Sequence, residues 1–180
     1  MNFIILDLEA TCWQGNLMDR NQEIIELAAY RVNGYREWID HFQSFIKPVQ
    51  HPRLSTYCTD LTGITQDQVS KAKSFEYIFP LFEDWFHALD GPQLICTWGG
   101  KDISLIKAEC RRCDADDSFL PGWIDLKSQY AGFHQLSKEV GLLKALEYND
   151  IDFEGSPHRA LDDAYNTAKL FLQYLDRWVY

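Results

Sequence analysis

The segment FIILDLEATCW, residues 3–13, begins as a buried strand and ends with two closely spaced acidic residues. Residues 3–6 are all apolar, which is typical of a central strand whose two faces are both covered. Successive side chains of a strand point to opposite faces, so Asp7 and Glu9 lie side by side on one face. Two carboxylates in this position repel each other, and the arrangement becomes tolerable if bound cations neutralise them.

Composition places the chain among ordinary globular proteins. Its 180 residues suffice for one domain, residues 1–180, and 46% hydrophobic and 24% charged residues are usual for a soluble protein. No apolar stretch approaches the roughly 18 residues that a membrane span needs. The N-terminus also lacks the pattern of a secretory signal. We therefore expect no membrane partner.

Cysteine usage and net charge narrow the possibilities further. Five cysteines are an odd number without the spacing of a disulfide framework, so we expect reduced thiols in a cytoplasmic protein. Cys110 and Cys113 form a CxxC pair, but no second pair accompanies them, which argues against zinc. The net charge of −10 argues against broad, non-specific binding of nucleic acid. It does not exclude a site at which bound divalent cations supply the positive charge.

The hydrophobic pattern predicts a layered α/β fold with a mixed sheet. Asn33-Gly34 is a strong signal for a hairpin turn between two strands. Ser74 is a plausible N-cap for a helix with aromatic residues at helical spacing, which we interpret as core packing. Strands come first and then alternate with helices, which indicates the α/β class. The predicted strands are residues 2–8, 23–32, 38–42, 93–98 and 123–126, and the predicted helices lie within 54–72, 75–86, 102–112, 137–147 and 160–177.

Further acidic residues and a histidine occur at the ends of later elements. Asp102 follows a glycine pair after the strand at 93–98, and His158 and Asp163 lie within SPHRALDDA, residues 156–164. In open α/β sheets, ligands bind outside the carboxyl ends of the strands. Magnesium and manganese prefer carboxylate oxygens, and a pair of these ions can flank an in-line phosphoryl displacement. Each motif alone also has a simpler interpretation. The DxE pair is exposed or paired with a lysine or arginine, Asp102 is a helix N-cap, and His158 is a turn residue.

Four separated motifs together resemble the DEDDh 3′–5′ exonucleases, and the Eri-type branch most closely. They are DLEATC at 7–12, LTGIT at 61–65, Asp102, and HRALDDA at 158–164, and the match runs in the family's order from residue 2 to about 175. The resemblance implies a ribonuclease-H-like fold with αβα layers around a mixed central sheet. It also implies a metal-dependent enzyme that removes nucleoside 5′-monophosphates from single-stranded 3′ ends.

The resemblance assigns chemical roles to five residues. Asp7, Glu9 and Asp163 would hold a catalytic metal ion, and Asp7 would also reach a second ion, so that the site takes two Mg²⁺ or Mn²⁺ ions. Asp102 would support the second ion through water. His158 would be the general base that takes a proton from the attacking water, a task that suits the ordinary histidine pKa of about 6.5.

The spacing between His158 and the following aspartates bears on this assignment. In a continuous helix, His158 would share a face with Asp162, four residues on, rather than with Asp163. The family pattern instead selects Asp163, which requires His158 to precede the helix. The residues at 155–157, Gly-Ser-Pro, make a loop plausible at this point, and we therefore choose Asp163 as the metal ligand.

Contacts with the substrate also follow from the resemblance. Ala10, Thr11, Tyr57 and Leu61 would border the 3′-terminal nucleotide, with Glu9 near its 3′-hydroxyl group. Tyr57 is either a ring that stacks on a base, which tolerates any sequence, or an ordinary core residue.

Lys101 departs from the family pattern. Many relatives carry an aromatic residue directly before the acidic residue of the third motif, where this chain has Lys101 before Asp102. A lysine does not stack on a base as a ring does, but it can pair with a phosphate. We therefore expect a contact with the substrate backbone, and the alternative is a lysine that faces solvent at a helix start.

The favoured function is therefore trimming of single-stranded 3′ ends. RNA is preferred over DNA by analogy with the Eri-type relatives. The alternatives are a DNA-trimming exonuclease of the same fold, a catalytically silent nucleic-acid-binding module and an acidic interaction scaffold. The complete set of five catalytic residues argues against the silent module, which has no need of clustered carboxylates. The sequence does not identify protein partners.

Overall fold

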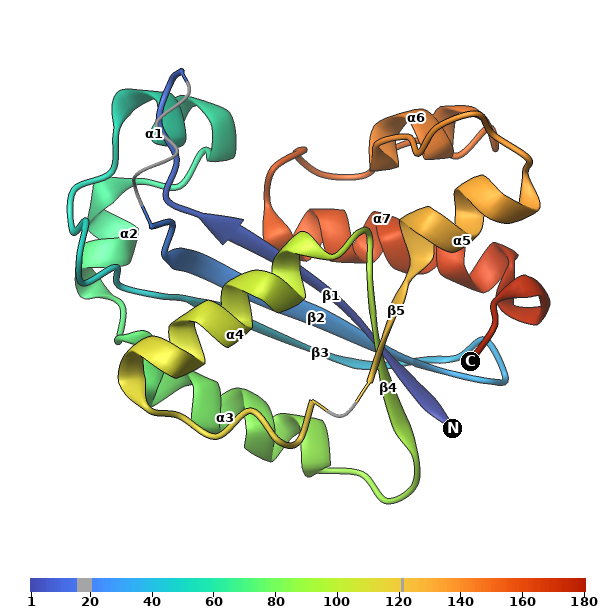
Figure 1. Ribbon diagram of the computed structural model, residues 1–180, viewed down its shortest axis with the longest axis horizontal. Coiled ribbons are helices and arrows are strands. Elements are labelled where there is room, and N and C mark those ends of the chain that lie inside the picture. Colours follow the sequence, from blue (N-terminus) through green and yellow to red (C-terminus); the bar gives the residue numbers. More distant parts are fainter. Residues whose placement is uncertain (16–20, 121) are drawn as a thin grey trace.

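Strand β1 (Asn2–Ala10) lies in the middle of a five-stranded mixed sheet formed within the described part of the chain (Figure 1). It pairs antiparallel with β2 (Ile24–Asn33) and parallel with β4 (Gln93–Thr97). The outer strands are β3 (Trp38–Phe45) and β5 (Trp123–Asp125), which gives the order β3-β2-β1-β4-β5. The mixed sheet that the sequence predicts is thus confirmed.

The computed structural model describes residues 1–15, 21–120 and 122–180. Within these ranges, no helix combines the length and the apolar character that a membrane crossing requires. The helices are α1 (Thr56–Thr62), α2 (Gln66–Lys71), α3 (Phe75–His87), α4 (Lys101–Cys113), α5 (Leu126–Phe133), α6 (Leu142–Glu147) and α7 (Ala160–Gln173), followed by a 3₁₀ turn at Leu175–Arg177.

The two faces of the sheet are covered by different helices. Alternation along β1 sends Ile4, Leu6 and Leu8 into a core formed with α3 and α4. Phe3 and Ile5 point the other way, into a core formed with α5, α6 and α7. All four residues of the apolar run are at most 3% exposed, as a strand covered on both faces requires. The result is an αβα layering.

The boundaries of several elements differ from the prediction. The strand predicted at 123–126 ends at Asp125, whose side chain accepts the Ser128 N–H at 3.0 Å and caps helix α5, which the sequence analysis did not predict. Helix α6 begins at Leu142 rather than at residue 137, with Gly141 at its N-cap. Helix α7 ends at Gln173 instead of continuing to residue 177.

The hairpin between β2 and β3 forms where the sequence predicts it. The Asn33 side-chain oxygen accepts the N–H groups of Tyr35 and Glu37 at 2.9 Å and 3.1 Å. The Asn33 N–H in turn donates to the Glu37 carbonyl at 3.1 Å, which closes the turn. Asn33 therefore fixes the register of the two strands.

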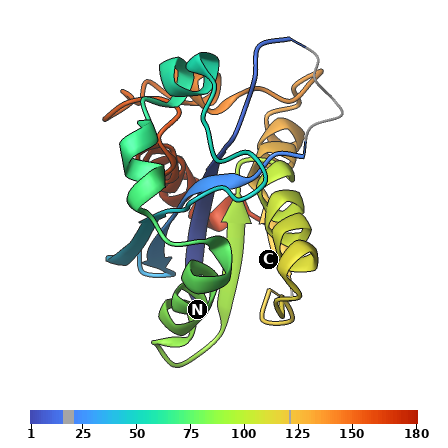
Figure 2. The same ribbon diagram turned by 90° about the vertical axis from the view of Figure 1, so that its left-hand side faces the viewer.

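One end of the sheet gathers the segments that carry the sequence motifs. Strands β1 and β4 are parallel, so their carboxyl ends lie at the same edge. Helix α1 lies over the carboxyl end of β1 in both views (Figures 1 and 2). Helix α7 packs against β1 and β2, and the loop before it reaches the same end of the sheet. Residues far apart in the sequence thus meet here.

Candidate active site

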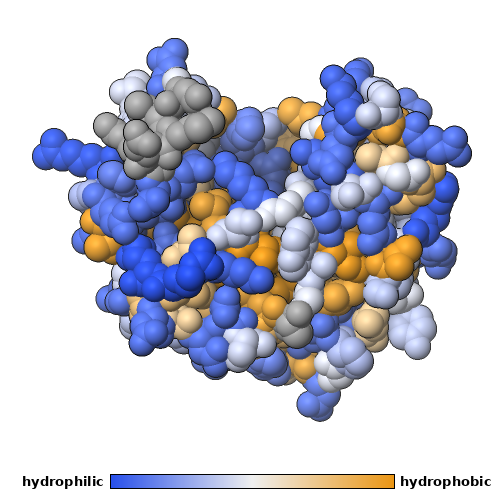
Figure 3. Space-filling model, viewed as in Figure 1, coloured by the Kyte–Doolittle hydropathy of each residue, from blue (hydrophilic) through white to orange (hydrophobic). Residues whose placement is uncertain are grey.

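A pocket of about 410 Å³ lies at the carboxyl ends of β1 and β4. In the space-filling view, the molecule is hollowed on this side, between the end that carries α1 and the end that carries α6 (Figure 3). The pocket contains all five predicted catalytic residues. Its lining consists of Asp7, Leu8, Glu9, Ala10, Cys12, Gln22, Leu61, Trp98, Lys101, Asp102, Leu105, His158 and Asp163.

Three carboxylates form the centre of this pocket. One oxygen each from Asp7, Glu9 and Asp163 lies within 4.8 Å of the other two, and all three residues are half-buried. Within the described residues, neither carboxylate of β1 forms an ion pair with a lysine or arginine. The simpler interpretation of DxE, as a pair that is exposed or capped by lysine or arginine, is therefore wrong. A close set of carboxylate oxygens suits a hard divalent cation.

Asp102 lies in the first turn of α4 and also lines the pocket. The helix begins at Lys101, and its N-cap position is occupied by Gly100. The alternative interpretation of Asp102 as the N-cap is therefore wrong. An added Cβ at Gly100 would approach the Trp123 ring to 3.1 Å, so the glycine allows α4 to begin close to β5.

Burial and mutual repulsion raise the pKa of these carboxyl groups. Burial is the largest cause at Asp7, whose pKa lies well above its ordinary value and is raised further by the charges of Asp102 and Asp163. Burial is also the largest cause at Glu9, Asp102 and Asp163, and their pKa values are raised to about 8, about 7 and about 6. Negative charge is thus poorly compensated in the pocket, which favours a bound cation.

His158 lies in the loop before α7, as the choice of Asp163 requires. The helix begins at Ala160 with Arg159 at its N-cap, and His158 has a φ of 63°, in the left-handed region that few residues other than glycine adopt. The charge of His158 and the backbone N–H groups of His158 and Arg159 act to lower the pKa of Asp163 against the larger effect of burial. The imidazole and the Asp163 carboxylate therefore belong to one site.

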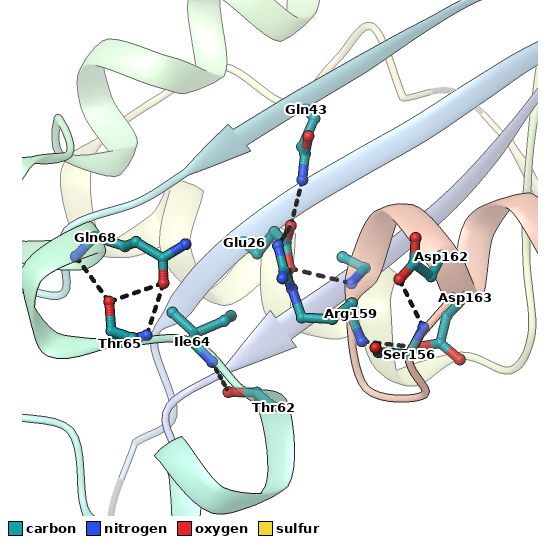
Figure 4. Close-up of polar contacts among 11 residues, drawn as sticks. Glu26, Gln43, Thr62, Ile64, Thr65, Gln68, Ser156, Arg159, Asp162 and Asp163 are labelled. Carbon is teal, nitrogen blue, oxygen red and sulfur yellow. Dashed lines mark hydrogen bonds and ion pairs between the residues drawn. The ribbon is translucent and has the colours of Figure 1, made fainter. Parts of the chain in front are cut away.

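The neighbouring residues Asp162 and Asp163 have different hydrogen-bond partners (Figure 4). The Asp163 carboxylate accepts the Arg159 N–H at 3.0 Å and faces the pocket. The Asp162 carboxylate accepts the Ser156 N–H at 2.8 Å. Asp162 fills the space beside Gly155, where an added Cβ would lie 2.4 Å from the Asp162 carboxyl carbon. Asp162 therefore holds the loop, while Asp163 belongs to the carboxylate cluster.

A buried ion pair that the sequence analysis did not identify supports this loop (Figure 4). Glu26 of β2 lies directly opposite Glu9 of β1 and is fully buried. Its two carboxylate oxygens accept the Nε and Nη2 of Arg159, both at 3.1 Å. One of them also accepts the Ala160 N–H at 3.2 Å, and the other accepts Nε2 of Gln43 at 2.6 Å. This Glu26–Arg159 clamp fixes the start of α7 on the sheet beside Glu9.

The predicted substrate contacts are only partly brought together. Ala10, Leu61 and Lys101 line the pocket. Thr11 is not among the lining residues: it is buried, its N–H donates to the Glu23 carbonyl at 2.8 Å, and its hydroxyl accepts the Glu23 N–H at 2.9 Å. Thr11 therefore joins the carboxyl end of β1 to the start of β2.

Tyr57 lies at the edge of this region rather than in the core. It is 42% exposed in the first turn of α1, so its interpretation as a core residue is wrong. It does not line the pocket, but it precedes Leu61 by one helical turn on the same face of α1. Lys101 is exposed at the start of α4, and its charge lowers the pKa of Glu9 and of Asp102 against the effect of burial.

Trp98 is a pocket residue that the sequence analysis placed in a strand without a role. Among the lining residues that the structure describes, it is the one Phe, Tyr or Trp side chain. Its indole N–H donates to the Val140 carbonyl at 3.2 Å, and its ring packs against Tyr130 at a centroid distance of 5.5 Å. The sequence does contain a signal for this role: Trp98 comes directly before the glycine pair, at the carboxyl end of a buried strand, where ligands bind in open α/β sheets.

Comparison with known proteins identifies the family. The Exonuclease family model, RNase_T, matches residues 4–171, and the chain belongs to this exonuclease family. The ERI1 exoribonuclease 2 of Homo sapiens is 34% identical over an alignment that covers 93% of this chain and 27% of that protein. The 3′-5′ exoribonuclease 1 of Mus musculus is 33% identical, with 95% of this chain and 52% of that protein covered.

Solved structures agree with this assignment. The nuclease domain of 3′hExo, a DEDDh family member bound to rAMP, superposes with a TM-score of 0.90 at 31% identity, and the match covers 97% of this chain and 92% of that one. The resemblance to DEDDh exonucleases of the Eri-type branch and the ribonuclease-H-like fold are thereby confirmed. The chain spans between about a quarter and about a half of the length of the two curated relatives.

Proposed function

We propose that this chain is a metal-dependent 3′–5′ exonuclease domain, spanning residues 1–180, that removes nucleoside 5′-monophosphates from single-stranded 3′ ends. The observation that carries the proposal is the convergence of Asp7, Glu9 and Asp163 within 4.8 Å, in a pocket that also holds Asp102 and His158. The five residues come from β1, α4, the first turn of α7 and the loop before it, so their meeting is a product of the fold.

The donor set fits Mg²⁺ or Mn²⁺. Asp7, Glu9 and Asp163 would hold one ion, and Asp7 together with Asp102 would hold or support a second. The chemistry that such a pair supplies is neutralisation of the charge that develops on the phosphate and activation of the attacking water. The raised pKa values of the carboxyl groups support this assignment, because they reflect burial first and then repulsion among the carboxylates, and a bound cation would offset both.

His158 takes the proton of the attacking water on an imidazole nitrogen. Its loop position supports this role, because the side chain is exposed at the mouth of the pocket while the clamp fixes the backbone on its C-terminal side. A general base of this kind contributes about 10²–10⁴-fold to a rate. The left-handed backbone at His158 is a strained feature of the kind that clusters at functional sites.

The pocket receives the 3′-terminal nucleotide. Ala10 and Leu61 border the terminal nucleoside, and Glu9 lies near its 3′-hydroxyl group. Tyr57, one helical turn from Leu61, can stack on a base at the rim, and Lys101 pairs with a phosphate. Thr11 acts indirectly, through the hydrogen bonds that hold the end of β1 to Glu23.

We propose RNA rather than DNA as the substrate. The support comes from the relatives, two of which are named exoribonucleases, and from the ribonucleotide in the solved 3′hExo nuclease domain. A cytoplasmic location is part of the same proposal. All five cysteines are unpaired in the structure, as expected in a reducing compartment.

The test is digestion of matched single-stranded RNA and DNA strands labelled at the 5′ end. With Mg²⁺ or Mn²⁺, we expect the RNA to shorten progressively from its 3′ end, with release of nucleoside 5′-monophosphates. Excess chelator should stop the reaction, and a 3′-phosphate should slow it by crowding the space beside Glu9. Cleavage in chelator or internal cuts in a circular strand would contradict the proposal. Faster degradation of DNA would contradict the substrate preference alone.

A further inference from the structure

A second hollow adjoins the candidate active site along helix α4. This groove has a volume of about 490 Å³ and shares Gln22 and Leu105 with the pocket that holds the carboxylates. Ala108, Arg111 and Arg112 continue its wall on the α4 side. Because the two hollows have wall residues in common, a linear ligand that leaves the pocket past Leu105 enters the groove.

Helix α4 presents a stripe of suitable side chains to this path. The helix runs from the carboxyl end of β4 across the front of the sheet (Figure 1). Lys101, Leu105, Ala108 and Arg112 follow one another at spacings of four, three and four residues, so they lie on one face of the helix. At 1.5 Å per residue, this stripe is about 16 Å long. It has a cation at each end and apolar side chains between them.

The acidic residues of the groove are already engaged inside the fold. The Glu23 carboxylate accepts the N–H groups of Val49, Gln50 and His51 at 2.6, 2.9 and 2.6 Å. The Glu109 carboxylate is paired with Arg112 and accepts the Ile24 N–H at 3.2 Å. Both glutamates are at most 3% exposed. Their charges are therefore compensated by protein donors rather than presented to a ligand.

The arginines are placed differently from the glutamates. Arg111 is exposed at the wall of the groove and, in the part of the chain that the structure describes, forms no ion pair. Arg112 is held by Glu109, which fixes its guanidinium beside the groove. The groove thus offers at least one cation to a ligand, in a protein whose net charge is −10.

We propose that this groove binds the sugar–phosphate backbone of a single strand upstream of the nucleotides that occupy the active site. Arg111 and Arg112 contact phosphates, and the side chains of Leu105 and Ala108 contact sugars or bases. The inference rests on the proposed function and extends it, because it names the path of the strand outside the catalytic pocket. It predicts that affinity, and not the chemical step, depends on strand length.

Arg111→Gln is the variant that tests the groove. Arg112 is less suitable, because its removal leaves the buried Glu109 without its partner. Lys107→Gln is the matched control, since Lys107 is an exposed cation of the same helix that does not line the groove. Binding is measured with calcium in place of the catalytic metal. The two ligands are an oligouridylate of roughly twelve nucleotides and a diuridylate. The oligouridylate is long enough to occupy both the pocket and the groove, because the smallest binding sites for single strands cover about four nucleotides.

We expect Arg111→Gln to weaken binding of the long strand and to lower its salt dependence by about 0.7 units of log Kd per log salt, the value for one phosphate contact. Binding of the diuridylate should not change, and Lys107→Gln should match the wild type with both ligands. Equal losses in the two variants, or an equal loss with the diuridylate, would overturn the inference. The proposed function fails separately, if the wild-type protein binds the strands but shortens neither with Mg²⁺ or Mn²⁺.

Discussion

Two adjacent aspartates in α7 show how the fold separates chemically identical residues. Asp163 joins Asp7 and Glu9 in the carboxylate cluster, while Asp162 accepts the Ser156 N–H and packs against Gly155. The separation depends on where the helix begins. With Ala160 as the first helical residue, His158 is outside the helix, and helical spacing no longer pairs it with Asp162.

Substitution of the two aspartates tests this separation. Asp163→Asn removes a ligand charge and should lower the rate of hydrolysis by several orders of magnitude, because the remaining carboxylates hold a cation poorly. Asp162→Asn should have a mild effect, since an amide oxygen can still accept the Ser156 N–H. Single-turnover rates with a 5′-labelled RNA measure both. Equal losses in the two variants would show that the assignment of Asp163 is wrong.

His158 gives a second test at the residue scale. His158→Asn removes the proposed base but keeps a residue that tolerates the left-handed backbone at this position. The rate should fall by about 10²–10⁴-fold, the usual contribution of a general base. The increase in Tm that Mg²⁺ or Mn²⁺ causes should remain, whereas Asp163→Asn should lose it. A variant that loses both activity and the metal response would place His158 among the ligands instead.

At the scale of elements, the start of α7 is the part of the site that the fold fixes most firmly. The Glu26–Arg159 clamp joins residues 133 positions apart in the sequence and holds the loop that carries His158 against β2. Arg159 also lies over the Phe45 ring, 5.4 Å from its centroid. Neither Glu26 nor Arg159 lines the pocket or the groove, and the clamp reaches the site through the Arg159 N–H on the Asp163 carboxylate, so its effect on catalysis is one of positioning.

Arg159→Ala should therefore affect both stability and turnover. It leaves the buried Glu26 without its cation, and breaking such a pair costs about 3–5 kcal/mol of unfolding free energy. A misplaced His158 should lower kcat by up to about 100-fold with little change in KM. Arg159→Lys should restore part of the stability but less of kcat, because an ammonium lacks the planar, two-pronged geometry with which the guanidinium holds both oxygens of Glu26.

Lys71→Ala is the matched control, since its ion pair with Asp67 is exposed and should contribute less than about 1 kcal/mol. Denaturant unfolding and steady-state kinetics measure the two effects. A normal kcat in folded Arg159→Ala would mean that the clamp supports the fold without positioning the base.

The sequence predicts elements well where the hydrophobic pattern is long or sharply bounded. The run at residues 3–6, the Asn33-Gly34 turn and the aromatic spacing of α3 are such cases. The sequence pattern does not indicate helix α5, because β5 runs directly into it without a loop. Asp125 is both the last residue of the strand and the N-cap of the helix. The family resemblance carried by the four motifs predicts five catalytic residues, and the structure brings these five into one pocket. The Glu26–Arg159 clamp could not be predicted from the sequence, because the residues around Glu26 and around Arg159 do not indicate which distant residue each one contacts.

At the scale of the whole molecule, the acidic charge directs where a nucleic acid can bind. A net charge of −10 repels phosphates over most of the surface, and the effect is strongest at low salt. The carboxylate pocket becomes attractive only with bound cations, and Lys101 and Arg111 offer positive charge beside it. Under the proposed function, we therefore expect binding only at the end of the strand and the few nucleotides before it, which suits an enzyme that acts on termini.

The burial of these carboxyl groups, together with their mutual repulsion, also makes the stability of the molecule depend on pH. In the folded protein, Glu9, Asp102 and Asp163 have pKa values raised to about 8, about 7 and about 6. Between the ordinary carboxyl values near 4 and these raised values, the folded state binds more protons than the unfolded chain. The free energy of unfolding therefore decreases as the pH rises through this window.

In the presence of a chelator, we expect the Tm to fall between about pH 5 and about pH 8, by about 2–4 °C for each kcal/mol of stability lost. Millimolar Mg²⁺ or Mn²⁺ should restore it at the upper end, because bound cations replace the missing protons. Asp7→Asn removes one of the crowded charges, so it should raise the Tm at pH 8 in chelator and reduce the response to metal. Asp67→Asn, which changes an exposed carboxylate outside the pocket, should do neither. A Tm that rises with pH in chelator, or an undiminished metal response in Asp7→Asn, would show that the cluster does not hold the cation.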